Sequence, residues 1–63
     1  MTIPEKIKQA RLDAGLTQHK LAELCGVATR TVIRWETGDR LVDTDHLRIV
    51  AQTLNLPLDD LIP

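Results

Sequence analysis

Aromatic side chains are almost absent from this sequence, which has no phenylalanine, no tyrosine and a single tryptophan, Trp35. A hydrophobic fraction of 43% is nevertheless normal for a folded globule, so a disordered chain is excluded. Leucine, isoleucine, valine and alanine must therefore fill the core. We expect residues 1–63 to form one small domain that buries roughly 60% of its unfolded surface.

Cysteine and long apolar runs are equally scarce. Cys25 is the only cysteine, which excludes an internal disulfide and is typical of the reducing cytoplasm. No apolar run approaches the ~18 residues that a membrane span needs, and no signal peptide is recognisable. These absences predict a soluble, cytoplasmic protein with no membrane partner.

The residue combinations that support catalysis are missing too. The sequence offers no nucleophile paired with a general base and no glycine-rich phosphate loop. His19 and His46 have no cysteine or histidine at the spacing of metal ligands. We therefore expect no enzyme, no metal site, no cofactor and no small-molecule ligand.

Charge is unevenly distributed along the chain. The formal net charge is −1. Residues 1–40 carry a balance of +2, whereas residues 41–63 carry −3 and have Arg48 as their one basic residue. An anionic partner should therefore meet the first two-thirds of the chain, and the last third should face solvent or another protein.

Turn and cap residues divide the chain into five predicted helical segments, with no strand-like alternation. Thr17 is a good helix N-cap, and so is Asp43 or Thr44. The residues suited to a left-handed helix end are Gly15, Gly26, Gly38 and Asn55. The predicted helices are residues 4–14, 18–25, 29–37, about 44–54, and a short turn opened by Pro57 that carries Leu58, Leu61 and Ile62. The fold class is therefore all-α.

The segment 29–37 has two different faces. At about 100° per residue, Val32, Trp35 and Glu36 fall on one side of this helix. The other side presents Thr29, Arg30, Ile33, Arg34 and Thr37. Such a face suits the DNA major groove, where arginine makes paired bonds to guanine O6 and N7. Taken on this helix alone, a solvated arginine face that binds nothing is the simpler interpretation.

The context of this helix favours the first interpretation. The stretch GLTQHKLAELCGVATRTVIRWETG, residues 15–38, resembles the helix-turn-helix of the lambda-repressor/Cro (XRE-type) family of DNA-binding domains. The matching features are Gly15-Leu16-Thr17-Gln18, Leu21-Ala22, Gly26-Val27, Val32, Trp35-Glu36 and Gly38. The resemblance extends over nearly all of the chain. It implies a compact five-helix domain whose second and third helices form the motif, with residues 29–37 as the recognition helix in the major groove.

The resemblance also assigns roles to particular residues. The residues at the family's base-reading positions are Thr29, Arg30 and Arg34. The residues at its phosphate-contacting positions are Gln18, Thr37 and Arg40. Arg11 and Glu36 match a pair that forms a structural salt bridge in this family. Glu36 falls on the apolar side of its helix, where a carboxylate needs a partner.

Three further residues belong to the predicted interface on physical grounds. Ile33 lies among the base-reading positions and is suited to a thymine methyl. Thr17 caps the second helix and leaves backbone N–H groups directed outward, as an anion site. The charge of Lys20 near a helix N-terminus becomes favourable only when a phosphate lies close.

The sequence departs from the family pattern at four positions, one of which is Ile33 in place of a residue that is usually polar. Ala28 stands where a small hydroxyl usually caps the recognition helix, and a poor cap costs roughly 1 kcal/mol. Lys20 replaces the acid that would complete a capping box with Thr17. Cys25 replaces a buried aliphatic residue and is expected to be a core thiol.

Two functions from different classes fit these features. The first is sequence-specific binding of a double-stranded DNA operator by a bacterial or phage transcriptional regulator. The resemblance implies a repressor rather than an activator, and we expect it to act as a homodimer on two half-sites. The alternative is a protein-interaction module, such as an antitoxin component, which the low net charge and the acidic last third favour. Apolar residues that either close the core or form an interface are Val42, Leu58, Leu61 and Ile62.

Overall fold

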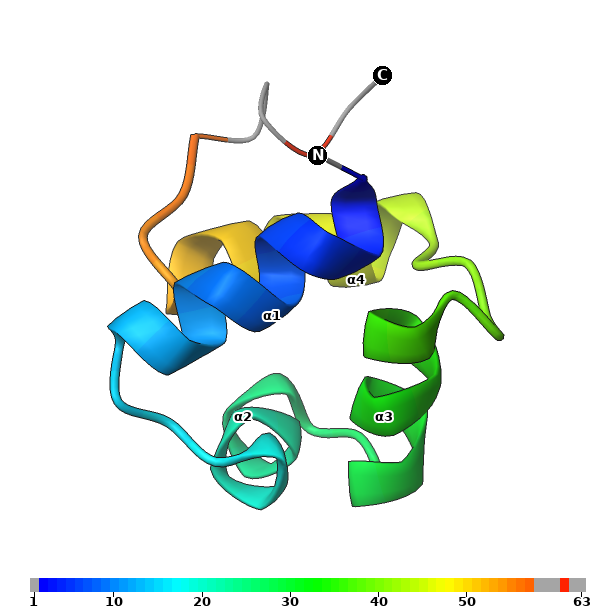
Figure 1. Cartoon of the computed structure of the whole chain (residues 1–63), viewed down its shortest axis with the longest axis horizontal. Coiled ribbons are helices and arrows are strands. Elements are labelled where there is room, and N and C mark those ends of the chain that lie inside the picture. Colours follow the sequence, from blue (N-terminus) through cyan, green and yellow to red (C-terminus); the bar gives the residue numbers. More distant parts are fainter. Residues whose placement is uncertain (1, 58–60, 62–63) are drawn as a thin grey trace.

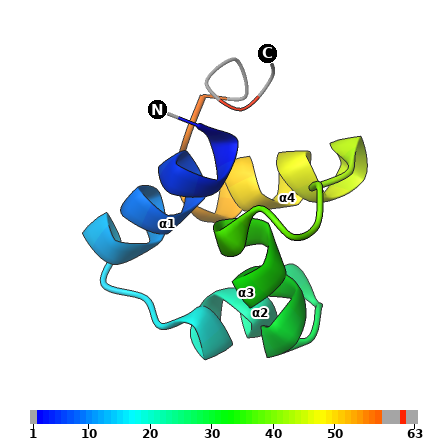
Figure 2. The same cartoon turned by 45° about the vertical axis from the view of Figure 1, so that its right-hand side comes forward.

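The computed structural model describes residues 2–57 and 61, and this part of the chain contains four α-helices and no strand. The helices are α1 (Ile3–Asp13), α2 (Gln18–Cys25), α3 (Thr29–Thr37) and α4 (Thr44–Thr53). In both views α1 and α4 occupy one half of the molecule, and α2 and α3 occupy the other (Figures 1 and 2). The predicted all-α class is confirmed.

The prediction of five helices is wrong, because the described residues hold four. After α4 the chain takes a left-handed turn at Asn55, and Leu56 and Pro57 are not helical. The predicted fifth helix falls mostly on residues 58–60 and 62, which lie outside the described residues, and Leu61 lies in a turn. A single helical turn fixes several residues for one hydrogen bond, so a segment this short gains little from forming a helix.

Side chains cap the starts of three helices. Thr2, Thr17 and Asp43 each accept a hydrogen bond from the backbone N–H three residues further along, at the starts of α1, α2 and α4. At the start of α3, Ala28 has the extended backbone of a cap, with φ −72° and ψ 149°, but no side-chain bond. The local signals therefore place α2 and α3 at the predicted bounds despite the one missing cap.

The turn between α2 and α3 depends on Gly26. Its φ of +72° lies in the left-handed region, which glycine enters without the steric cost of a Cβ. The next residue, Val27, donates its N–H to Ala22 O at 3.0 Å and packs against the core. Ala22 is itself 1% exposed. The small side chain and the tight turn together allow α3 to cross close to α2.

The hydrophobic core is built almost entirely from aliphatic residues around one tryptophan. Trp35 is 1% exposed and is the largest buried side chain. The other buried apolar residues of the described part are Ile7, Leu21, Ala22, Cys25, Val32, Leu47, Val50, Ala51, Leu54 and Leu61. Of the four residues suited to either core or interface, Leu61 lies in the core. Val42 is partly buried, and Leu58 and Ile62 lie outside the described residues.

Candidate nucleic-acid interface

The outer face of α3 carries basic side chains that have no structural role. Arg30, Ile33 and Arg34 are exposed, whereas Val32 and Trp35 on the inner face are buried. Within residues 2–57 and 61, the guanidinium groups of the two arginines make no hydrogen bond or ion pair. The helix therefore presents two unpaired cations and one apolar side chain to solvent.

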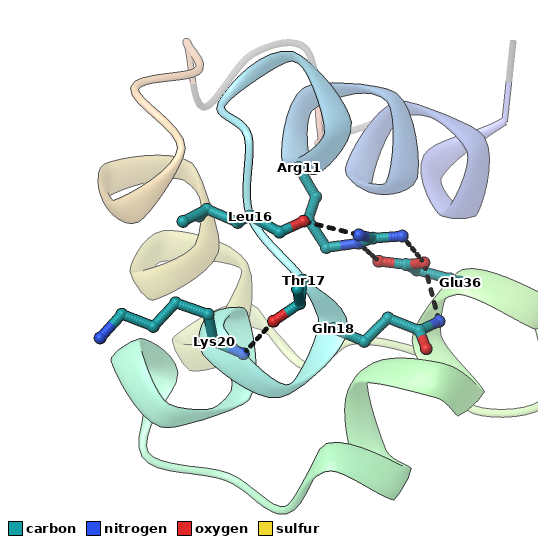
Figure 3. A network of polar contacts seen from close by, with 6 residues as sticks. All are labelled: Arg11, Leu16, Thr17, Gln18, Lys20 and Glu36. Atoms are coloured by element: carbon teal, nitrogen blue, oxygen red, sulfur yellow. Dashed lines mark hydrogen bonds and ion pairs between the residues drawn. The ribbon is translucent and has the colours of Figure 1, made fainter.

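A buried ion pair fixes α3 against α1. Arg11 donates from Nε to Glu36 Oε2 at 2.7 Å and from Nη2 to Glu36 Oε1 at 3.1 Å (Figure 3). The two side chains are only 8% and 3% exposed. Arg11 also donates from Nη1 to the carbonyl oxygen of Leu16 at 2.7 Å, directly before the cap of α2. One guanidinium therefore sets the position of both helices of the motif.

Gln18 takes part in the same network, which the sequence did not reveal. Its Nε2 donates to Glu36 Oε1 at 3.2 Å, so this side chain bridges α2 and α3 (Figure 3). Its role predicted from the sequence is a phosphate contact. Lys20 leaves the same end of α2 in the opposite direction, and its backbone N–H donates to Thr17 Oγ1 at 3.0 Å. At the start of α2, Gln18 thus bonds within the domain, whereas the side chain of Lys20 lies at the surface.

Thr37 and Arg40 lie exposed at the far end of α3. The Thr37 hydroxyl donates to Arg34 O at 3.3 Å, and the backbone N–H of Arg40 donates to the same oxygen at 3.2 Å. These bonds close the last turn of the helix at Gly38. The guanidinium of Arg40 stays at the surface, so the two predicted phosphate positions remain together.

A contact between the two helices of the motif is likewise not evident from the sequence. His19 Nδ1 lies 3.0 Å from the hydroxyl oxygen of Thr29, the first residue of α3. His19 Nε2 lies 3.9 Å from a carboxylate oxygen of Glu23, one turn further along α2. The only sequence signal is that a polar residue stands at the start of each helix, and such a signal does not identify a pair.

Two further titratable side chains, Cys25 and His46, have defined surroundings. Burial raises the pKa of the Cys25 thiol above its ordinary value, while a hydrogen bond with Thr53 acts the other way. The His46 ring lies 5.5 Å from Trp35 between ring centroids and pairs with Asp43. Among residues 2–57 and 61, no three histidine, cysteine or acidic side chains gather where they would hold a metal ion.

An apolar pocket of about 120 Å³ lies beside the loop that follows α3. Its lining residues are Ile3, Pro4, Trp35, Gly38, Arg40, Leu41 and Val42. Binding sites for small molecules usually enclose about 300–1,000 Å³, so this pocket is smaller than a usual ligand site. None of the helices in the described part of the chain has the length and apolar content of a membrane span.

Comparison with known proteins links this geometry to one family. The family model for helix-turn-helix domains matches residues 7–61. The transcriptional activator BcrR of Enterococcus faecalis is 29% identical over 62 residues. This match covers 98% of the present chain but only 30% of BcrR, so the chain spans less than a third of that relative.

Solved structures show the same fold. One is SinR, a master regulator of biofilm formation, which was solved in complex with DNA. Its TM-score is 0.89 and its sequence identity 27%, and the match covers 98% of this chain and 100% of the SinR chain. The P22 c2 repressor, solved with a synthetic operator, has a TM-score of 0.92 over 98% of this chain and 94% of that one. Its identity is 21%, so it supports the fold alone. The resemblance to lambda-repressor/Cro domains is thereby confirmed.

Proposed function

The chain belongs to the helix-turn-helix family, and from this premise we propose that it binds double-stranded DNA sequence-specifically as a transcriptional regulator. Helix-turn-helix domains are DNA-binding modules and not enzymes. The observation that carries the proposal is the outer face of α3, where Arg30 and Arg34 are exposed without a partner in the described part of the chain. A helix of this kind fits the major groove, and arginine reads guanine there through two bonds.

Base reading is assigned to four residues of α3, namely Thr29, Arg30, Ile33 and Arg34. Their positions on one helix face support this assignment, because a helix in the groove meets base edges along its outer side. Ile33 is 39% exposed between the arginines, which is unfavourable in water but suits a thymine methyl.

Phosphate contacts are assigned to two groups at opposite ends of the motif. The first group is Thr17, Gln18 and Lys20. The second group is Thr37 and Arg40. Thr17 uses its hydroxyl as the cap, so its share of the contact comes from the backbone N–H groups of the first turn of α2. Gln18 gives one N–H of its Nε2 to Glu36, which leaves the second N–H for a phosphate, and Lys20 points the other way, toward a different phosphate (Figure 3).

We propose that residues 1–63 act as a DNA-binding domain that forms a homodimer on DNA. One domain of this size reads few base pairs, and two copies on half-sites about one helical turn apart, ~34 Å, extend the readout. The similar proteins include a transcriptional activator, BcrR, and a master regulator solved with DNA, SinR, which supports regulation of transcription. Repression remains our proposal for this chain because a bound domain over a promoter blocks polymerase without needing a further contact.

The test is selection of binding sites from a random duplex DNA pool at moderate salt. An inverted repeat among the recovered sequences is expected, and its spacing reports the geometry of the dimer. Affinity for the recovered site should fall steeply as the salt concentration rises. A plot of the logarithm of the association constant against the logarithm of the salt concentration should have a slope of about −0.9 for each phosphate contact. If the folded protein enriches no sequence, the proposal is refuted. The remaining candidate is then the protein-interaction module, which these relatives do not favour.

A further inference from the structure

His19 is placed to control a residue of the reading face. Its side chain is 76% exposed and stands in the first turn of α2, and its Nδ1 lies 3.0 Å from Thr29 Oγ1. Its other ring nitrogen, Nε2, lies 3.9 Å from Glu23 Oε2. Within the described residues these are the partners of the ring. One ring nitrogen is therefore within hydrogen-bond distance of a hydroxyl, and the other lies near a carboxylate without a hydrogen bond to it.

The carboxylate of Glu23 selects the tautomer of the neutral ring. With the proton on Nε2, the N–H faces the carboxylate and is attracted to it. With the proton on Nδ1, the lone pair of Nε2 would face the same negative charge. Because the proton on one ring nitrogen is influenced by the partner of the other, this arrangement favours the neutral tautomer with its proton on Nε2. Nδ1 is then an acceptor, and the Thr29 hydroxyl must donate to it.

Protonation of the ring reverses this bond. Both nitrogens of an imidazolium are donors, so Nδ1–H donates to Thr29 Oγ1. The hydroxyl has one proton and two lone pairs. With neutral His19 its proton is used and only lone pairs face outward. With protonated His19 its proton is free. The hydroxyl thus changes from an acceptor to a donor toward any group in front of α3.

We propose that His19 is a positioning residue that sets the base preference of Thr29 and makes this preference depend on pH. The inference rests on the proposed DNA binding, because Thr29 needs a base edge to read. With neutral His19, Thr29 accepts from the amino groups of adenine or cytosine. With protonated His19, it donates to the oxygen or nitrogen acceptors of guanine or thymine.

Other charged groups near His19 leave the direction of this change intact. On α2 these are Glu23 and the neighbouring Lys20. On α3 the charged residue of the first turn is Arg30, which makes no ion pair within the described part of the chain. Helix α4 packs on the opposite, buried face of α2, where Thr53 reaches Cys25.

The experiment compares affinities for two duplexes that differ only at the base pair opposite Thr29, taken from the selected site. Affinities are measured at about pH 5.5 and about pH 8, between which histidine changes its charge, at one ionic strength. A charged ring also attracts phosphates, but this effect is common to both duplexes and cancels in their ratio. For the unmodified protein we expect the ratio to change by about three- to tenfold, the effect of one hydrogen bond.

Matched variants locate the effect. His19→Asn keeps a donor and an acceptor but does not titrate, and Thr29→Val removes the hydroxyl at similar volume, so both should abolish the pH dependence of the ratio. Thr29→Ser keeps the hydroxyl and should retain it. His46→Gln removes the other histidine and should also retain it. A ratio that is equal at both pH values, or a change that persists in His19→Asn, overturns the proposal.

A second measurement separates this inference from the proposed function. Nitrogen-15 NMR of the free protein near pH 8 reports which ring nitrogen of His19 carries the proton. A proton on Nε2 supports the proposal, and a proton on Nδ1 overturns it whether or not DNA binds. If no duplex binds at either pH while the protein is folded, the proposed function fails and the inference about base preference fails with it.

Discussion

Arg11 and Glu36 stand 25 residues apart in the chain and meet through two hydrogen bonds in the interior of the domain. Glu36 Oε1 accepts a further bond from Gln18, and Arg11 holds the backbone at Leu16. Every buried side-chain nitrogen or oxygen in the described part has a hydrogen-bond partner, as buried polar groups require. The angle between α2 and α3 therefore depends on polar groups as well as on the apolar core.

Arg11→Ala should destabilise the domain strongly. Removing one partner of a buried pair leaves the other charge without compensation and costs about 3–5 kcal/mol. The total free energy of unfolding of a domain of this size is about the same, roughly 3–5 kcal/mol. Most of the variant should therefore be unfolded at room temperature. Urea unfolding followed by circular dichroism measures the loss. Arg48→Ala, an equal charge change at an exposed position of α4, is the control and should be nearly neutral.

Arg34→Ala should act on binding and leave the fold intact. Its guanidinium has no partner in the described part of the chain, so only the contact with DNA is lost. We expect a loss of about 1–3 kcal/mol in binding free energy and a relaxed preference at one base pair of the selected site. Titration of labelled duplexes measures both effects. If this substitution unfolds the domain, the assignment of Arg34 to the solvent-exposed face of α3 is wrong.

Ala28→Ser should stabilise the domain. The backbone at this position already has the conformation of an N-cap, and the side chain that would accept from α3 is missing. A serine at this position should add about 0.5–2 kcal/mol to the free energy of unfolding. Ala14→Ser, at the exposed C-terminal end of α1, introduces the same hydroxyl where no cap is formed and should add nothing. Equal melting temperatures for all three proteins would refute the capping argument.

Acid should weaken the domain through Asp43. The hydrogen bond with His46 holds the pKa of this carboxyl below its ordinary value of 3.8, and a smaller desolvation effect opposes it. A carboxyl whose pKa is lower in the folded state stabilises that state above the unfolded pKa, and this contribution is lost as the pH falls through the folded pKa. The free energy of unfolding should therefore decrease below about pH 4.

Asp43→Asn tests this dependence, since asparagine caps a helix as well as aspartate but does not titrate. The variant should show a smaller decrease of stability below about pH 4 in urea unfolding. Asp39→Asn, which removes an exposed acid from the same loop, is the matched control and should keep the decrease. The same acid dependence in all three proteins would exclude Asp43 as its source.

The bounds of α2 and α3 are predictable because their determinants are local. Thr17 and Gly26 mark the two ends of α2, and Gly38 marks the end of α3, each by its own backbone or side-chain chemistry. The buried position of Glu36 is predictable from helical periodicity in the same way. The predicted count of five helices is wrong for the described residues, which hold four, and most of the segment after Pro57 lies outside them.

Contacts between helices are predictable only where a family resemblance supplies them. The bond from Gln18 to Glu36 spans 18 residues, and the contact between His19 and Thr29 spans 10. Both contacts depend on how α2 crosses α3. The residue pattern within a single helix does not determine that crossing. The sequence therefore assigns Gln18 to phosphate alone. The base and phosphate assignments stay predictions, which a DNA complex or a binding assay tests.

The lack of bonds from the Arg30 and Arg34 guanidinium groups within the described part of the chain has a consequence for how such a protein changes over time. The side chains of Arg30 and Arg34 make no polar contact that holds the described part of the chain together, and Ile33 beside them is 39% exposed. Substitutions there alter the target and spare the scaffold, so new specificities can arise without compensating changes in the core. A library randomised at these three positions should consist mostly of folded proteins with divergent operators.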